Sequence, residues 1–365
     1  MVLKSFFIYN PCSCCLDQSQ MKLSHIKFSN ISLFLLRNLA RIITIITVLF
    51  ILLGVMGHTV RDRTVELAVL MYIPLLPLGL WAVLWDLFRV GRSLPLFRFG
   101  LTVIGLGIMI WGGVSMIGMG GSQMPLEPDK QVSILHWNVY WGGRGKKGWK
   151  SIRHDIEQRH PDIAILSEPP AEDRLILLLQ QMGWQTIMYE NTRSNPLAIC
   201  SSWPLQFERF VRFRNGRGMI VVVTVRGQPL RVLAVDGKRN MSNRLVVLSR
   251  EVLPRLRTPL LTGVVETIEA NQATGQPIDI IAGDFNALSF SRGFDAFALM
   301  GGGYHLASKF SRDWRGTWIS LLPLYDIDHV WVHKHFQGLR TELLTNLKSD
   351  HRGQLVQFKL WTPIS

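Results

Sequence analysis

Cysteine is scarce in this sequence. Its 365 residues include four cysteines: Cys12, Cys14 and Cys15 near the N-terminus, and Cys200 in the second half. A single cysteine after residue 15 excludes an internal disulfide framework in the larger C-terminal part. The N-terminal cluster lacks a second Cys or His pair at zinc-site spacing. We therefore interpret it as part of an unstructured leader over residues 1–32, with metal binding and lipid attachment as the alternatives.

Acidic residues are also few relative to basic ones. The chain has 26 Asp and Glu against 40 Lys and Arg, which gives a net charge of +14. A strongly basic chain favours anionic partners, either lipid headgroups or phosphate-bearing substrates. Charge alone does not choose between nucleic acid and lipid phosphate.

Ionisable residues are nearly absent from three apolar stretches in the N-terminal part, at 42–57, about 65–87 and about 101–119. The mean hydropathy of the chain is +0.19, which is high for a soluble enzyme. Any one stretch could be a buried core helix, but three in succession predict three transmembrane helices within residues 33–121. The lack of charge at their centres argues against a transporter.

The basic residues that flank these stretches predict the topology. Lys22, Lys27, Arg37 and Arg41 precede the first stretch, whereas the first loop carries only two arginines. The positive-inside rule therefore places the N-terminus in the cytoplasm. Three spans would then put the C-terminal part on the outer side of an inner or plasma membrane.

The composition changes after residue 121. A short polar segment, 122–131, predicts a linker, and short apolar runs then alternate with amphipathic segments over 132–365. This alternation predicts an α/β domain. We expect strands at 132–137, 163–166, 219–225, 230–235, 278–282, 330–332 and 355–360, and helices at 149–159, 172–182 and 243–256.

The strongest local motif follows the predicted strand 278–282. It reads Gly283-Asp284-Phe285-Asn286-Ala287. In an extended segment, the side chains of Asp284 and Asn286 would point to the same side. One could then act on a water molecule while the other donates to a phosphate oxygen. The alternative is an ordinary strand-ending turn, which Asp and Asn favour.

Polar residues also lie at the ends of other predicted strands. Asp350-His351 precedes the last strand and suits metal binding or proton transfer. Asp328 stands at the entry to strand 330–332, where it could orient an imidazole. Glu168 ends a buried apolar strand, a costly place for a charge unless a cation such as Mg²⁺ is its partner. Asn138 ends the first strand of the domain.

The order and spacing of these motifs resemble those of the endonuclease/exonuclease/phosphatase superfamily, which includes pancreatic-type DNase, apurinic endonucleases, inositol-polyphosphate phosphatases and neutral sphingomyelinases. The resemblance covers about Val132–Leu360. It implies a two-sheet β-sandwich flanked by helices, preceded here by the predicted helical membrane region of a bacterial-type, membrane-anchored member. It also implies a Mg²⁺ cofactor, with Mn²⁺ as the alternative. Glu168 would bind the metal, assisted by Asn138 and Asp350.

The resemblance implies catalytic roles for four further residues. Asp284 would orient or deprotonate the attacking water, and Asn286 would hold a phosphate oxygen. His351 would contact the phosphate or act as acid and base, and Asp328 would fix its tautomer. This division of labour is what hydrolysis of a phosphoester requires.

One departure from the family pattern affects the expected substrate contacts. Many members carry a histidine where this chain has Asp236. We expect Lys238, Arg239 or Arg244 to replace it electrostatically as substrate-binding residues.

A separate basic run interleaves four arginines with phenylalanines: Arg209, Arg212, Arg214 and Arg217. It is either a nucleic-acid or headgroup surface or, as we favour, the solvated face of a strand pair.

The sequence thus predicts a membrane-anchored phosphoesterase that acts on phosphodiesters or phosphomonoesters. Its substrate would be a nucleic acid or a lipid phosphate, with membrane lipid as a further partner and no obligatory protein partner. The alternatives are a lipid-phosphate or lipid-pyrophosphate hydrolase at the outer membrane face, and a non-catalytic scaffold that retains the fold.

Overall fold

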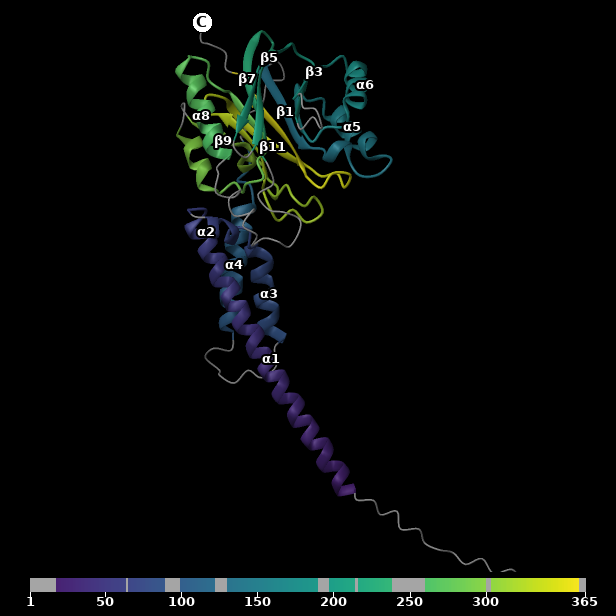
Figure 1. The fold of residues 1–365 in the computed structure, drawn as a ribbon, viewed down its shortest axis with the longest axis vertical. Coiled ribbons are helices and arrows are strands. Elements are labelled where there is room, and N and C mark those ends of the chain that lie inside the picture. Colours follow the sequence, from purple (N-terminus) through teal and green to yellow (C-terminus); the bar gives the residue numbers. More distant parts are fainter. Residues whose placement is uncertain are drawn as a thin grey trace, which may run out of the picture.

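The computed structural model describes residues 18–63, 65–88, 99–121, 130–189, 197–213, 216–237, 260–299 and 303–360. These residues form a bundle of helices and an α/β domain seated on one end of it (Figure 1).

The bundle consists of α1 (Gln18–Val60), α2 (Val65–Leu70), α3 (Leu75–Phe88) and α4 (Gly100–Met116). α3 and α4 approach closely because Gly79 and Gly105 face each other: a Cβ atom at either would meet the other's carbonyl oxygen within 2.8 Å. Two indoles tie α3 to α1, since Trp81 donates to Thr47 at 3.1 Å and Trp85 donates to Thr44 at 3.0 Å.

The expectation of three membrane spans is wrong. Among the described residues, one helical segment, Phe34–Val60, is long and apolar enough to cross a membrane. The second apolar stretch is divided between α2 and α3 by a turn ending at Pro74, which has no backbone N–H to continue a helix. α3 and α4 have 14 and 17 residues. At their length of roughly 21 and 26 Å, they are shorter than a hydrocarbon core of about 30 Å.

The expected disordered leader is also partly wrong. α1 begins at Gln18, so residues 18–32 are helical. The sequence explains this continuation, because no Pro or Gly occurs between Gln18 and Gly54. Residues 1–17, with three of the four cysteines, lie outside the described residues. The fourth, Cys200, is buried and free.

Two six-stranded sheets face each other, in the strand orders β11-β12-β1-β2-β4-β3 and β5-β6-β7-β8-β10-β9. β1 (Gln131–Asn138) is parallel to β2 (Ile163–Ser167) and antiparallel to β12 (Gly353–Lys359). β8 (Ile280–Asp284) is parallel to β7 (Gln228–Gly237) and antiparallel to β10 (Asp328–His333). The other strands are β3 (Gln185–Met188), β4 (Leu197–Ser201), β5 (Leu205–Phe213), β6 (Gly216–Val225), β9 (Tyr304–Leu306) and β11 (Gln337–Leu344).

The apolar residues alternate between two layers of core. On β1, Val132 and Ile134 point between the sheets, whereas Leu135 and Trp137 point to the outer face. α5 (Gly148–Arg159) and α6 (Glu172–Met182) cover that face, and α8 (Leu260–Ala273) with the 3₁₀ segment η4 (Arg292–Ala298) covers the other sheet (Figure 1). The predicted two-sheet sandwich flanked by helices is therefore confirmed. The helix expected at 243–256 lies outside the described residues.

Candidate active site

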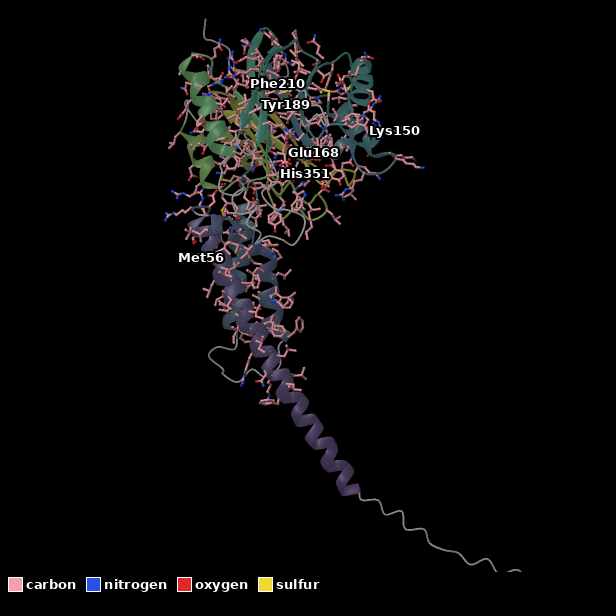
Figure 2. The ribbon with its side chains drawn as sticks, viewed as in Figure 1. Met56, Lys150, Glu168, Tyr189, Phe210 and His351 are labelled. Atoms are coloured by element: carbon pink, nitrogen blue, oxygen red, sulfur yellow. The ribbon has the colours of Figure 1, made fainter. Side chains whose placement is uncertain are left out.

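Residues from both sheets meet at the end of the domain nearer the bundle. Asn138 ends β1, Asp284 ends β8, and Asp328 begins β10 directly opposite Asp284. His351 lies two residues before β12, which pairs with β1. Figure 2 shows Glu168 and His351 in the half of the domain that faces the bundle. Strand pairing thus gathers residues that are far apart in the sequence.

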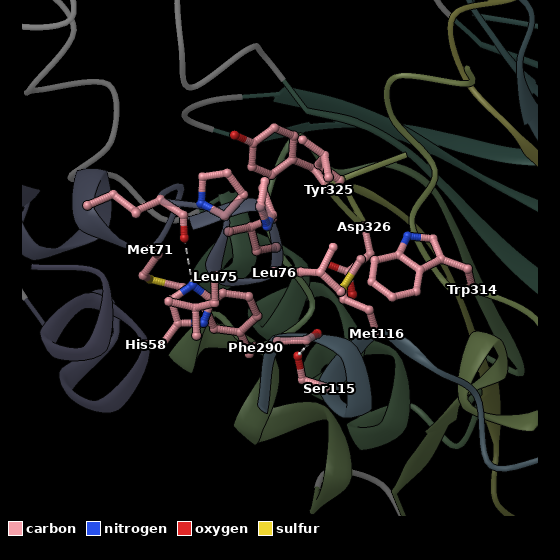
Figure 3. Close-up of a pocket in the computed structure, with 16 residues that line it drawn as sticks. His58, Met71, Leu75, Leu76, Ser115, Met116, Phe290, Trp314, Tyr325 and Asp326 are labelled. Carbon is pink, nitrogen blue, oxygen red and sulfur yellow. Dashed lines mark hydrogen bonds between the residues drawn. The ribbon is translucent and has the colours of Figure 1, made fainter. Parts of the chain in front are cut away.

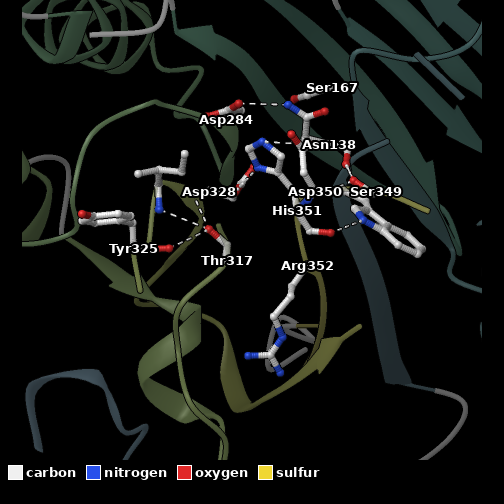
Figure 4. Close-up of polar contacts among 12 residues, drawn as sticks. Asn138, Ser167, Asp284, Thr317, Tyr325, Asp328, Ser349, Asp350, His351 and Arg352 are labelled. Carbon is white, nitrogen blue, oxygen red and sulfur yellow. Dashed lines mark hydrogen bonds and ion pairs between the residues drawn. The ribbon is translucent and has the colours of Figure 1, made fainter. Parts of the chain in front are cut away.

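The central pair of the site is Asp328 with His351. Their Oδ2 and Nδ1 atoms lie 2.7 Å apart, and both side chains are buried (Figure 4). Burial alone would lower the pKa of His351, but the charge and hydrogen bond of Asp328 raise that pKa to about 9. Burial would likewise raise the pKa of Asp328, yet His351 holds it below its usual value. The pair is therefore an imidazolium–carboxylate pair at neutral pH.

The backbone around this pair is fixed by three further side chains. The Thr317 hydroxyl accepts a hydrogen bond from the Asp328 amide at 3.2 Å, and Gln354 donates to the Asp328 carbonyl at 2.6 Å. The Trp137 indole donates to the His351 carbonyl at 3.1 Å. These contacts leave the pair little freedom to separate.

Asp284 lies beside the pair and is held from two sides. The side-chain Nδ2 of Asn138 donates to Asp284 Oδ2 at 3.0 Å, and the main-chain N–H of Asn286 donates to Asp284 Oδ1 at 2.9 Å. Burial, followed by the charge of Asp328, raises the pKa of Asp284 to about 8. A carboxylate with that proton affinity is suited to accept a proton from water near neutral pH.

The expected geometry of the Asp284–Asn286 motif is wrong. β8 ends at Asp284, and Asn286 takes a left-handed conformation with φ of +50°. The two side chains therefore do not share one face of an extended strand. Asn286 Nδ2 instead donates to the Gly237 carbonyl at 2.8 Å.

A possible metal site overlaps these residues. Asp284, Asp328 and His351 each offer a ligand atom, and these atoms lie within 4.8 Å of one another. Asp328 Oδ1 is buried and has no hydrogen-bond partner within the described part of the chain. Oxygen-rich sites of this kind suit hard divalent cations. Because metal ligands must be deprotonated, a protonated His351 would leave the carboxylates as the ligands.

The three residues expected at the metal lie at the same end of the domain. Glu168 directly follows β2, and its carbonyl accepts a hydrogen bond from the Trp141 amide at 2.7 Å. Asp350 Oδ2 lies 3.3 Å from Arg144, and its Oδ1 lies 3.9 Å from His351 Nε2. Asn138, the third, contacts Asp284 as described above. Their role at a metal stays a prediction.

The sequence interpretation placed Arg217 in the basic run but did not foresee its position beside the site. Its Nε lies 2.9 Å from Asp236 Oδ2, and Asp236 is the register partner of Asp284. The basic run is thus not uniformly a solvated face. Counting outward from the β6–β7 turn pairs Arg217 with Asp236, so hairpin register was the signal available. Lys238, Arg239 and Arg244, expected to bind substrate, lie outside the described residues.

Comparison with known proteins places these observations in a family. The model of the Endonuclease/Exonuclease/phosphatase family matches residues 135–351, which is more than half of the chain. No curated protein matches the sequence.

The chain is similar to several solved structures at low sequence identity. The human Nocturnin catalytic domain with a bound sulfate anion is 18% identical, with a TM-score of 0.50 over 65% of this chain and 96% of that one. TDP2 from C. elegans is 16% identical, with a TM-score of 0.48 over 63% of this chain and 75% of that one. An endonuclease/exonuclease/phosphatase from Beutenbergia cavernae is 16% identical, with a TM-score of 0.48 over 65% and 73%. Since the family match includes Asn138, Asp284, Asp328 and His351, this chain belongs to the endonuclease/exonuclease/phosphatase family and is a hydrolase of phosphoester bonds.

Proposed function

We propose that this chain is a membrane-anchored, Mg²⁺-dependent phosphoesterase that hydrolyses phosphodiesters or phosphomonoesters. The observation that carries the proposal is the buried Asp328–His351 pair, 2.7 Å apart, directly beside Asp284. A buried cation and a carboxylate of raised pKa together provide what attack of water on a phosphate needs.

Each residue has a distinct part in this proposal. Asp284, oriented by Asn138, holds the attacking water and accepts its proton. His351, kept protonated by Asp328, places positive charge where the phosphate oxygens gain negative charge. Asn286 holds a phosphate oxygen.

A divalent cation fits the acidic end of this site. Glu168, with Asn138 and Asp350 nearby, would hold Mg²⁺ or Mn²⁺, and the bound ion would neutralise charge on the phosphate.

The anchor in this proposal is α1. Its Phe34–Val60 segment is of spanning length, with Arg37 and Arg41 near its N-terminal end and Lys22 and Lys27 before it. These basic residues favour a cytoplasmic N-terminus, so one crossing puts the domain on the outer side of an inner or plasma membrane. α3 leads away from the domain and α4 leads back to it beside α1 (Figure 1). This helical hairpin therefore leaves the domain on the side of the membrane that the end of α1 reaches.

The test is hydrolysis by the full chain in detergent, with Mg²⁺ or with EDTA. The substrates are bis(p-nitrophenyl) phosphate, p-nitrophenyl phosphate and plasmid DNA. We expect turnover with Mg²⁺ that falls to the EDTA background in Glu168→Gln. The matched control is Glu172→Gln, an exposed glutamate in the first turn of α6, which should keep full activity.

A second variant tests the histidine. We expect His351→Ala to lose about 10²-fold or more of the turnover. Absence of metal-dependent turnover on every substrate would refute the proposal and favour a non-catalytic scaffold.

A further inference from the structure

Large apolar side chains are exposed beside the catalytic histidine. In the loop before β10, Leu321 is 78% exposed and Leu322 is 63% exposed, and Ile319 precedes them. Leu347, in the turn after β11, is also 63% exposed. We call these four residues the apolar rim. Neighbouring exposed apolar side chains of this size mark a surface that contacts a partner or a membrane.

The rim is joined to the active site by hydrogen bonds. Ser320, between Ile319 and Leu321, donates from its amide to the Asp350 carbonyl at 2.8 Å and from its hydroxyl to the Ser349 carbonyl at 2.8 Å. Trp318 forms a backbone bridge with His351. Anything that contacts the rim therefore lies next to the segment that carries Asp350 and His351.

The same loop is joined to the end of the bundle. Ile117, just after α4, forms a backbone bridge with Trp314, and the Trp314 indole donates to the Pro323 carbonyl. The end of α4 is itself apolar and exposed, with Val114 at 68% and Ile117 at 52%. In Figure 1 the yellow-green loops of this region lie at the end of the domain nearest the bundle. Exposed apolar side chains thus occur both at the end of the bundle and in the rim.

Polar contacts fix the domain against the bundle. Both Arg61 guanidinium nitrogens Nη1 and Nη2 contact the Asp295 carboxylate, at 2.8 and 2.9 Å, and the Arg292 amide donates to Asp62 at 2.8 Å. His58 stacks on Phe290 with ring centroids 4.7 Å apart, at the wall of a pocket between the two parts (Figure 3). These contacts therefore fix the position of the domain, and of the rim on it, relative to the end of α1.

The charges around the rim suit an anionic surface. The Arg144 amide donates to the Lys348 carbonyl at 2.7 Å, which brings the loop after β1 beside Leu347. Arg144, Lys146, Lys147 and Lys348 are all exposed. Basic side chains around exposed leucines are the arrangement that binds the headgroup layer of an anionic bilayer.

From these contacts we infer that the apolar rim enters the interfacial layer of the bilayer that holds α1, and that the site hydrolyses the phosphoester of a membrane lipid. The substrate part of this inference rests on the proposed hydrolysis, and the insertion of the rim rests on the proposed anchoring by α1 together with the exposed surface itself. A lipid phosphate at this depth reaches His351 without leaving the membrane.

The first test measures insertion without relying on activity. The environment-sensitive dye NBD is attached at Leu322→Cys in the full chain, with Cys12, Cys14 and Cys15 replaced by Ser and buried Cys200 retained. The chain is placed in vesicles of phosphatidylcholine and phosphatidylglycerol. We expect blue-shifted NBD emission that doxyl-labelled lipid quenches. The matched control is Phe207→Cys, on β5 beside Phe210, which lies at the far end of the domain (Figure 2). Equal, water-like emission at both positions would overturn the inference.

The second test separates lipid from soluble substrate. Phosphatidic acid and phosphatidylglycerol in the vesicles are compared with bis(p-nitrophenyl) phosphate in solution. The double variant Leu321→Asp with Leu322→Asp should lose about tenfold or more of the lipid hydrolysis, because burying one leucine is worth more than tenfold. Its hydrolysis of the soluble ester should stay within about twofold, which also shows that the variant is folded.

The outcomes distinguish this inference from the proposed function. Metal-dependent cleavage of the soluble ester, with lipid left untouched, would overturn the lipid assignment and leave the phosphoesterase standing. No cleavage of any ester would overturn both the phosphoesterase and the lipid assignment, and the NBD result would then decide the insertion alone.

Discussion

The hydroxyl of Tyr72, in the turn between α2 and α3, donates a hydrogen bond to the main-chain carbonyl of Asn286 at 3.2 Å. The Tyr72 carbonyl in turn accepts a hydrogen bond from Tyr325 at 3.0 Å. Met71 is buried beside Leu288, just past the Asp284 motif. The turn between α2 and α3 is therefore part of the scaffold beneath the active site, although a linker separates the bundle from the domain in the sequence.

This contact predicts that Tyr72→Phe lowers kcat on bis(p-nitrophenyl) phosphate, because Asn286 loses a contact that positions it. Its free energy of unfolding should fall by about 1 kcal/mol, the typical worth of one hydrogen bond. Tyr325→Phe is the matched control, since it removes a hydrogen bond between the same two parts but not the one to Asn286. It should lose similar stability and retain kcat. Equal kcat in the two variants would contradict a positioning role.

Arg217 should matter for catalysis through Asp236 and Asp284. The variant Arg217→Ala removes the guanidinium that lies 2.9 Å from Asp236. The negative charge of Asp236, no longer balanced by Arg217, should then raise the pKa of Asp284 further. We expect kcat at neutral pH to fall about tenfold, which corresponds to a pKa shift of about one unit. Arg217→Lys should recover part of the loss. Arg212→Ala, at the exposed cross-strand partner of Arg217, should behave as wild type. A loss of the same size in Arg212→Ala would indicate a general effect of surface charge instead.

Metal binding should stabilise the chain through the acidic site. At a hundredfold excess of Mg²⁺ over its Kd, the free energy of unfolding should rise by about 2.7 kcal/mol, and EDTA should reverse the gain. Glu168→Gln should abolish most of this gain, whereas Asp173→Asn, an exposed position in α6, should keep it. Thermal unfolding of the wild type and the two variants, with Mg²⁺, Mn²⁺ or EDTA, measures the gain in stability. A full gain in Glu168→Gln would place the metal elsewhere.

Asp279 should give a pH-dependent stability that is separate from the site. Burial raises its pKa to about 6 from 3.8, although it accepts a hydrogen bond from the Arg231 amide. Tyr304 and His335 also face it, the latter at 3.6 Å. Because the folded state holds the proton more tightly, the stability cost of the charge is present above pH 6 and disappears as pH falls below about 4.

The variant Asp279→Asn removes this cost. It should be more stable than wild type at pH 8 by about 3 kcal/mol, and the difference should vanish near pH 4. Urea unfolding at pH 8, 6 and 4 measures the difference, with Asp173→Asn as the exposed control. A difference that does not change with pH would show that Asp279 is not the titrating group.

Local patterns were sufficient for many elements of the domain. The helices expected at 149–159 and 172–182 appear as α5 and α6, because amphipathic periodicity is a property of adjacent residues. Edge strands were missed: in β5, buried and exposed positions do not alternate regularly, so periodicity gives little signal. α8 was missed as well, although its apolar residues lie on one buried face.

The order of the motifs along the chain was enough to identify the family and the chemistry. Each of their residues lies at or next to the end of a strand that hydrophobicity alone reveals: Asn138, Glu168, Asp284, Asp328 and His351. Folding was needed for everything that depends on pairing between distant segments. The Pro74 turn and the lengths of α3 and α4 reduce three apolar stretches to one of spanning length, and docking brings Tyr72 to Asn286. Contacts between the bundle and the domain join residues as far as 253 positions apart, and no local pattern encodes which of them will meet.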